Sequence, residues 1–142
     1  MTPRQNIEIP EPALSRFLFA DTRLAAVWLI IRLYVGWQWL AAGWDKIHSP
    51  AWTGSGAGEA LIGFLNSALA KTGGAHPDVP GWYGAFLSGF ALHHTVFLSY
   101  LVSYGEVLVG AALILGIFTG IAAFFGAFMN FNYLLSGSLS VN

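Results

Sequence analysis

The chain has no cysteine among its 142 residues. This absence excludes disulfide bonds, iron–sulfur clusters and zinc sites held by thiolates, and haem attached through a C-x-x-C-H motif. Electron carriers that are bound through cysteine are therefore excluded.

Charged residues are also scarce, at 9% of the chain with a net charge of -1, whereas a soluble domain carries about 25%. A nearly neutral chain is a poor partner for nucleic acid. Hydrophobic residues make up 56%. This composition predicts one integral membrane domain that is surrounded by a lipid bilayer. We expect that bilayer to be the inner (cytoplasmic) membrane of the cell.

Histidine gives little support for a metal or haem site. The chain has four histidines, His48, His76, His93 and His94. Adjacent residues on a helix point about 100° apart, so His93 and His94 cannot face one ion together. No histidine lies inside an apolar run, and there is no glycine-rich phosphate loop. We therefore expect no metal site and no bound haem in this chain.

Three apolar stretches predict an all-α transmembrane helical bundle. The first, residues 22–43, reaches about 33 Å as a helix, which is enough to cross the hydrocarbon core. Residues 95–135 would form a helix of about 60 Å, twice that thickness. We expect this stretch to fold back at Gly116–Gly120, which gives a second span at 95–115 and a third at 119–135.

The segments outside these spans have a different composition. Residues 44–94 contain three prolines and a glycine-rich stretch, and we expect an extramembrane helical cap with short helices at 59–71 and 82–92. In residues 1–21, the spacing of Leu14, Phe17 and Leu18 fits an interfacial helix, although a disordered N-terminus fits as well. Arg16 and Arg23 flank the start of the first span, so the positive-inside rule places the N-terminus in the cytoplasm.

Two ionisable residues lie near the centres of apolar spans, where charge is costly. If the cytoplasmic ends of the first two spans are aligned, Arg32 and Glu106 lie at matching depth, and we hypothesise that they form an ion pair. Asn130 lies at similar depth in the third span. The intramembrane polar cluster expected from this reasoning consists of Arg32, Glu106, Asn130, Asn132, Tyr104 and Tyr34. Such a cluster either fixes the register of the helices or handles a proton or an anion beside a bound ring.

The exit of the first span carries Trp44, Asp45 and Lys46. Aromatic and charged residues at such a position are typical of the membrane–water interface. Lys46 either extends its ammonium group to the headgroups or attracts a small anion. We predict that all three residues are interfacial.

Two blocks of polar and small residues resemble a known family. The first block is Ile31–Gly36 followed by Trp39–Lys46, and the second comprises Gly105, Glu106, Gly110, Gly116, Phe118, Thr119 and Met129–Asn132. Together they are similar to the first helix, the Gly-Glu helix, the turn and the following helix of the DoxX/DoxD-like membrane proteins. The resemblance covers most of residues 24–137.

This resemblance implies both a fold and a function. Family members have four transmembrane helices, whereas this chain ends at Ser136–Asn142, where a loop into the fourth would begin. Either the sequence is truncated or incomplete, or a partner supplies the packing surface. The family is named for the membrane subunit of a thiosulfate:quinone oxidoreductase, which implies a subunit of a quinone-linked oxidoreductase complex. Such a subunit binds no redox cofactor of its own but meets a quinone and other membrane subunits. The alternative is a non-catalytic accessory subunit that scaffolds a larger respiratory or photosynthetic complex.

Overall fold

The computed structural model describes residues 21–138, together with Pro12 and Phe17. Within this part of the chain every regular element is a helix, which confirms the all-α prediction. The elements are η1 (Thr22–Leu24), α2 (Ala25–Ile47), α3 (Pro50–Thr53), α4 (Glu59–Ala70), α5 (Gly81–Gly89), η2 (Ala91–His94), α6 (Thr95–Leu115) and α7 (Thr119–Leu135). The interfacial helix predicted around Leu14 and Leu18 lies outside the described residues.

Helices α6 and α7 have the bounds of the second and third predicted spans. The turn between them begins at Gly116, whose φ of 73° closes α6 in the left-handed conformation that glycine adopts at low cost. Phe118 also has a positive φ, 49°. Helix α2 continues to Ile47, four residues past the predicted end of the first span at Gly43.

Helices α2 and α6 are antiparallel and approach closely at glycines. A Cβ atom at Gly43 would lie 2.7 Å from the backbone nitrogen of Val107, and one at Gly36 would lie 2.9 Å from Cγ1 of Ile114. Gly110 faces the backbone of Leu40 in the same way. Small residues at these positions bring the two backbones together, as is common between membrane helices.

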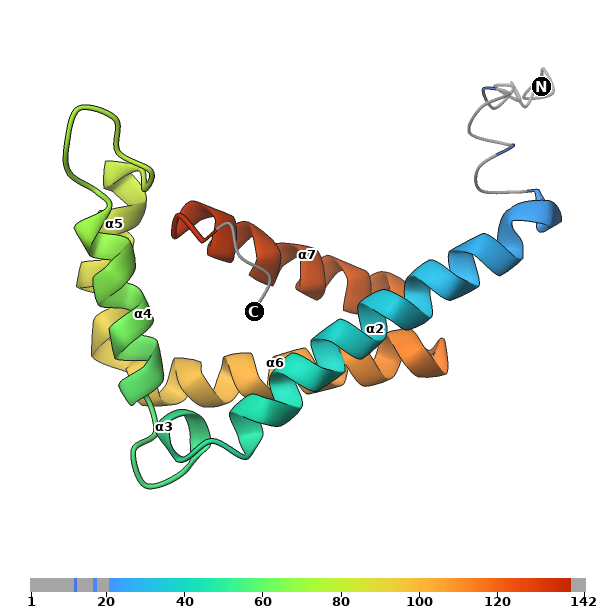
Figure 1. Ribbon diagram of the computed structural model, residues 1–142, viewed down its shortest axis with the longest axis horizontal. Helices are drawn as coiled ribbons and strands as arrows, with labels where there is room; N and C mark the ends of the chain where they lie inside the picture. Colours follow the sequence, from blue (N-terminus) through green and yellow to red (C-terminus); the bar gives the residue numbers. More distant parts are fainter. Residues whose placement is uncertain (1–11, 13–16, 18–20, 139–142) are drawn as a thin grey trace, which may run out of the picture.

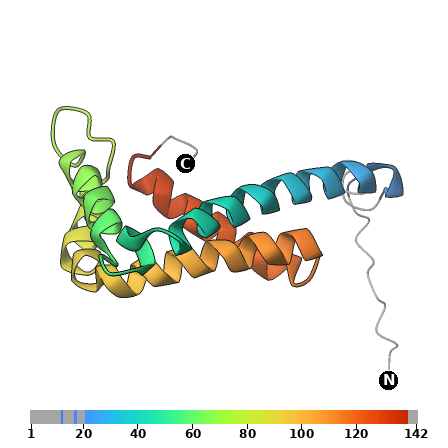
Figure 2. The same ribbon diagram turned by 60° about the horizontal axis from the view of Figure 1, so that its bottom comes forward.

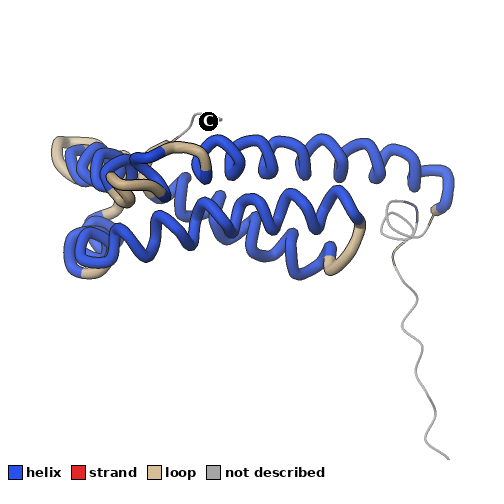
Figure 3. The backbone as a smooth tube through the Cα atoms, turned by 90° about the horizontal axis from the view of Figure 1, so that it is seen from below, coloured by secondary structure: helices blue, strands red, loops and turns tan. Residues whose placement is uncertain are grey.

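These contacts stagger the two helices. Gly116, just after the end of α6, lies against the guanidinium group of Arg32. The part of α2 that precedes Arg32 therefore extends beyond the α6–α7 turn, which is visible in Figures 1 and 3. Large apolar side chains, among them Leu29 and Ile30, are exposed there.

Helices α4 and α5 lie at the other end of α6, roughly across its axis (Figures 1 and 2). The residues buried among these elements form one apolar core: Leu61, Leu65, Ala68, Val79, Tyr83, Leu87 and Ala91. The C-terminal end of α7 meets the same region, where the Lys71 ammonium group donates a hydrogen bond of 2.9 Å to the carbonyl oxygen of Gly137.

Two helical stretches of the described residues are long and apolar enough to cross a membrane, Thr22–Ile47 and Gly81–Leu115. The second includes α6. Helix α7 has 17 residues, which is at the lower limit of the roughly 17–25 residues that a transmembrane helix needs. Large apolar side chains are exposed along α2, α6 and α7, and faces of this kind are typical of contact with lipid.

Candidate functional site

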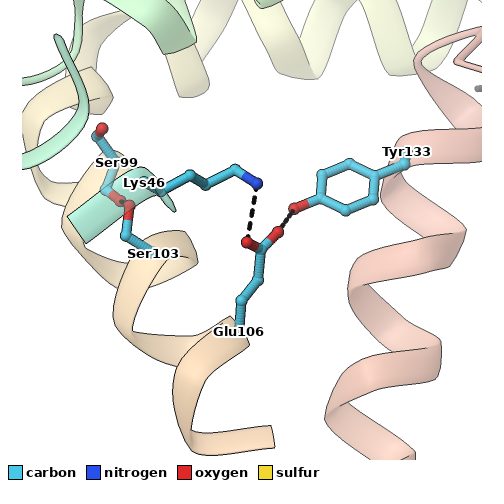
Figure 4. Close-up of polar contacts among 5 residues, drawn as sticks. All are labelled: Lys46, Ser99, Ser103, Glu106 and Tyr133. Atoms are coloured by element: carbon cyan, nitrogen blue, oxygen red, sulfur yellow. Dashed lines mark hydrogen bonds and ion pairs between the residues drawn. The ribbon is translucent and has the colours of Figure 1, made fainter. Parts of the chain in front are cut away.

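Glu106 lies at the centre of a buried polar cluster that joins three helices (Figure 4). Its side chain is almost fully buried, and its Oε2 atom accepts a hydrogen bond of 2.8 Å from Nζ of Lys46 on α2. Its Oε1 atom accepts a hydrogen bond of 2.6 Å from the hydroxyl of Tyr133 on α7. We call these three residues the Glu106 cluster.

The close packing of α2 on α6 brings Lys46 to Glu106. Lys46 follows Gly43 by three residues and so lies on the same face of α2, and a Cβ atom at Gly43 would lie 2.9 Å from Cβ of Glu106. The ammonium group also lies 5.2 Å from the centre of the Trp52 ring, within the range of a cation–π interaction.

Two fully buried serines precede Glu106 on the same face of α6. The Ser99 hydroxyl donates a hydrogen bond of 2.6 Å to the carbonyl oxygen of Trp52, and the Ser103 hydroxyl donates one of 2.8 Å to the carbonyl oxygen of Ser99. Neither hydroxyl donates to Glu106 in this arrangement. The carboxylate therefore depends on Lys46 and Tyr133 for the hydrogen bonds described here.

An apolar cavity of about 420 Å³ lies beside the cluster. Helices α4, α5, α6 and α7 form its walls, and the polar side chains among its lining residues are Tyr83, Asn132, Tyr133 and Ser136. The other lining residues are apolar and include the phenylalanines 64, 86, 125 and 128. We call this space the apolar cavity.

A second cavity of about 480 Å³ is lined in part by Gln38, Asp45, Lys46, Ser49 and Trp52. Tyr133 lines both cavities. One residue of the Glu106 cluster thus borders the apolar cavity, and two border the second, more polar cavity. The cluster therefore lies between the apolar cavity and a more polar one.

The predicted ion pair between Arg32 and Glu106 is wrong. Glu106 forms its ion pair with Lys46, and the Arg32 guanidinium lies against Gly116, ten residues further along the chain than Glu106. Ten residues of helix correspond to about 15 Å along the axis. The error follows from aligning the start of the first span with the end of the second, because α2 in fact extends beyond the end of α6. The Nε atom of Arg32 is buried without a hydrogen-bond partner among the described residues.

The other residues of the predicted cluster do not join Glu106. Asn130 is exposed, and the Tyr104 ring is exposed and stacks on that of Tyr100. The Tyr34 hydroxyl accepts a hydrogen bond of 3.0 Å from Gln38 at an exposed position. Asn132 does not contact Glu106 either, but it lines the apolar cavity and accepts a hydrogen bond from Tyr83.

The ammonium group of Lys46 does not extend to the headgroups, because the residue is only 8% exposed and is paired with a buried carboxylate; the interfacial depth of the residue stays a prediction. Its neighbours Trp44 and Asp45 are exposed, and their interfacial placement stays a prediction. Tyr133 and Tyr83 are not among the residues that the sequence predicted for the site. Among the described residues, no group of three His, Asp or Glu side chains lies close enough together to hold a metal ion.

The helices and the buried cluster define a helical membrane protein whose interior is organised around one carboxylate. The model of the DoxX family matches residues 27–136 of the chain. The protein belongs to the DoxX family, and the matched range contains all three residues of the Glu106 cluster. No curated protein and no solved structure matches the chain.

Proposed function

We propose that this protein is the membrane subunit of a quinone-linked oxidoreductase complex, and that the apolar cavity binds the ring of the quinone. The observation that carries the proposal is the position of the apolar cavity beside the Glu106 cluster. The chain supplies the binding site and no redox cofactor, so a partner subunit exchanges electrons with the ring.

The size and lining of the cavity support a flat, apolar ligand. Binding sites for small molecules have volumes of about 300–1,000 Å³ and are lined mainly by apolar and aromatic side chains with a few polar groups. The apolar cavity, at about 420 Å³, fits this description. Its aromatic lining provides rings against which a quinone ring can pack.

The position of the cavity supports a ligand that arrives through the bilayer. Leu101 and Leu108 on α6 and Phe125 and Phe128 on α7 line the cavity, and each is also more than half exposed. The cavity is thus bordered by side chains that face outward from the bundle. A lipid-soluble molecule reaches it from the side without crossing a polar surface.

The Glu106 cluster supports a role in proton transfer. Reduction or oxidation of a quinone moves protons together with electrons, and a positioned carboxylate or tyrosine can supply or accept them. Tyr133 lines the apolar cavity and is hydrogen-bonded to Glu106. Lys46 lines the polar cavity on the other side, so the cluster offers a path between the ring and polar surroundings.

A substitution that fills the cavity tests the proposal. Gly105 lines the apolar cavity, and an added Cβ there would lie 3.7 Å from Sδ of Met129, an ordinary contact. We expect Gly105→Leu to abolish binding of a short-chain quinone to the full chain in lipid nanodiscs, and Gly105→Ala to retain it. Unchanged binding in both variants contradicts the proposed site.

The alternative is a non-catalytic accessory subunit that scaffolds a larger respiratory or photosynthetic complex. One observation favours it: both oxygens of Glu106 have partners within the protein, as expected for a cluster that fixes helix register. Purification of the native assembly separates the two functions. A complex that keeps full activity with Gly105→Leu supports the scaffold, and loss of activity with normal assembly supports the quinone site.

We further propose that the protein spans the inner membrane of the cell three times, through α2, α6 and α7, with its N-terminus in the cytoplasm. Arg16 and Arg23 near the start of α2 support this orientation through the positive-inside rule. On the opposite side, Lys46 is paired with Glu106 and is therefore not a free flanking charge. Helices α3, α4 and α5 then form the cap outside the membrane.

A further inference from the structure

The hydroxyl groups that line the apolar cavity donate their hydrogen atoms to other atoms of the protein. The Tyr133 hydroxyl donates to Glu106 Oε1 at 2.6 Å, and the Tyr83 hydroxyl donates to the Oδ1 and backbone oxygen of Asn132 at 3.1 and 3.2 Å. The Ser136 hydroxyl donates to the backbone oxygen of Asn132 at 2.8 Å. All three hydroxyls that line the cavity therefore have their hydrogens engaged.

Asn132 is the fourth polar side chain that lines the apolar cavity. Its Nδ2 atom donates a hydrogen bond of 2.8 Å to the backbone oxygen of Phe128. An amide nitrogen carries two hydrogens, so one N–H of Asn132 is left among these side-chain donors. By contrast, each of the three hydroxyl oxygens keeps lone pairs that can accept a hydrogen bond.

The donation from Tyr133 is the most strongly fixed of these bonds. Glu106 forms an ion pair with Lys46, and a carboxylate can only accept hydrogen bonds. If the Tyr133 hydrogen turned toward a ligand, Oε1 of a buried carboxylate would lose the donor that the structure gives it. A buried acceptor without a partner is costly, so the Tyr133 oxygen can meet a ligand only as an acceptor.

We propose that the apolar cavity selects the reduced, hydroxyl-bearing form of its ring ligand, a quinol, over the oxidised quinone. This inference rests on the proposed quinone site and specifies the redox state that the site prefers. The two carbonyl oxygens of a quinone only accept hydrogen bonds, whereas the two hydroxyls of a quinol donate them. A cavity with three acceptor oxygens and one remaining side-chain N–H can form more hydrogen bonds with the quinol than with the quinone.

The same arrangement sets the direction of proton transfer, from the bound quinol through Tyr133 to Glu106. A quinol hydroxyl that donates to the Tyr133 oxygen extends a chain from quinol to Tyr133 to Glu106, and each bond of such a chain polarises the next. As a partner subunit withdraws electrons, the quinol proton passes to Tyr133 while the Tyr133 proton passes to Glu106. Glu106 must release each proton toward the second cavity, which Lys46 borders, before it can accept the next. Two such rounds, with two protons released and two electrons passed to the partner's acceptor, convert a quinol into a quinone.

A binding measurement tests the inference on the full chain in lipid nanodiscs. The probes are a decyl-substituted benzoquinone and its hydroquinone, compared under anaerobic conditions, with empty nanodiscs as the correction for partition into lipid. We expect the hydroquinone to bind about tenfold more tightly, as one additional hydrogen bond of about 1.4 kcal/mol would give. We expect Tyr133→Phe to reduce this preference to about twofold or less, because the variant removes the acceptor oxygen and keeps the ring.

Two further variants keep the test decisive. Ser136→Ala removes another acceptor oxygen at the cavity and should also lower the preference, even if Tyr133→Phe does not fold. Tyr100→Phe is the matched control, since the Tyr100 hydroxyl donates to the carbonyl oxygen of Thr53 and its side chain does not line the cavity. It should leave the preference unchanged.

The outcomes distinguish this inference from the proposed function. Equal affinity for both forms, or tighter binding of the quinone, overturns the selection of quinol and leaves the quinone site standing. A preference that persists in Tyr133→Phe and Ser136→Ala also overturns it, because the cavity oxygens are then not its cause. If neither form binds, the proposed quinone site fails and the inference fails with it.

Discussion

The ion pair between Lys46 and Glu106 should be among the most strongly coupled pairs in the protein. Its Nζ–Oε2 distance is 2.8 Å, and at an effective dielectric constant of about 20 two unit charges at this distance attract by about 6 kcal/mol. Removal of both charges from water offsets most of that attraction. Removal of only one partner lowers the stability much more, because it leaves the other charge buried and unpaired.

We therefore expect Lys46→Met and Glu106→Gln each to lower the free energy of unfolding by about 3–5 kcal/mol. Gln at position 106 keeps an oxygen that accepts from Tyr133. The double variant has no unpaired buried charge, so it should lose less than the sum of the single variants, with a coupling energy of about 3 kcal/mol. The measurement is unfolding of the purified protein in mixed micelles with increasing dodecyl sulfate, followed by circular dichroism.

The matched control is the pair that the sequence suggested. The losses of unfolding free energy caused by Arg32→Leu and Glu106→Gln should be additive within about 0.5 kcal/mol. The Arg32 guanidinium lies beside Gly116, far along α6 from Glu106. Additive losses for Lys46→Met with Glu106→Gln would refute the reasoning. So would a coupling energy between Arg32 and Glu106 of comparable size.

Two other predictions concern packing and topology. Gly110→Ala should destabilise the protein by about 2 kcal/mol or more in the same unfolding assay, because the new methyl group meets the backbone of Leu40. The control is Gly63→Ala, which should be neutral or stabilising because no atom lies within 4 Å of the new methyl group. Similar losses of stability in both variants would argue against the close α2–α6 contact. Because the chain lacks cysteine, single cysteines can report sidedness. An impermeant maleimide added to intact cells should label Ala75→Cys in the cap and not Ile117→Cys in the α6–α7 turn. In inverted vesicles it should label Ile117→Cys and not Ala75→Cys. Labelling of Ile117→Cys in intact cells would instead place the N-terminus outside.

The lengths of the two C-terminal helices could be predicted from the sequence because a local signal sets them. The apolar stretch of residues 95–135 is too long for one span, and Gly116 supplies the positive φ that a turn needs. The short helix at 59–71 was predicted from its apolar spacing and appears as Glu59–Ala70. In each case the necessary information lies within a few residues of the helix or the turn.

The partner of Glu106 depends on the register between two helices, which apolar periodicity does not specify. The alignment of helix ends favoured Arg32, but α2 and α6 are staggered and Lys46 is the partner. One signal in the sequence could have corrected this. Gly36 and Gly43 lie seven residues apart on α2 and mark the face that approaches Gly110, and Lys46 follows on that face.

Tyr133 and Tyr83 could not be found in this way. Tyr133 reaches Glu106 because of how α7 packs against α6, and Tyr83 reaches Asn132 because α5 lies across the end of α6. These angles depend on the packing of the cap, including the buried core around Leu65 and Leu87. No local pattern in the sequence encodes them.

Photo-crosslinking provides the decisive test of the proposal that the apolar cavity beside the Glu106 cluster binds a quinone-type ring. The native assembly would be illuminated with a short-chain azidoquinone, and the labelled peptides of this chain would be identified by mass spectrometry. We expect label on residues 98–109 of α6 and on residues 125–136, at the C-terminal end of α7 and just beyond it, abolished by Gly105→Leu and retained in Gly105→Ala. Label confined to other parts of the chain, or label on the cavity residues that Gly105→Leu leaves unchanged, would contradict it.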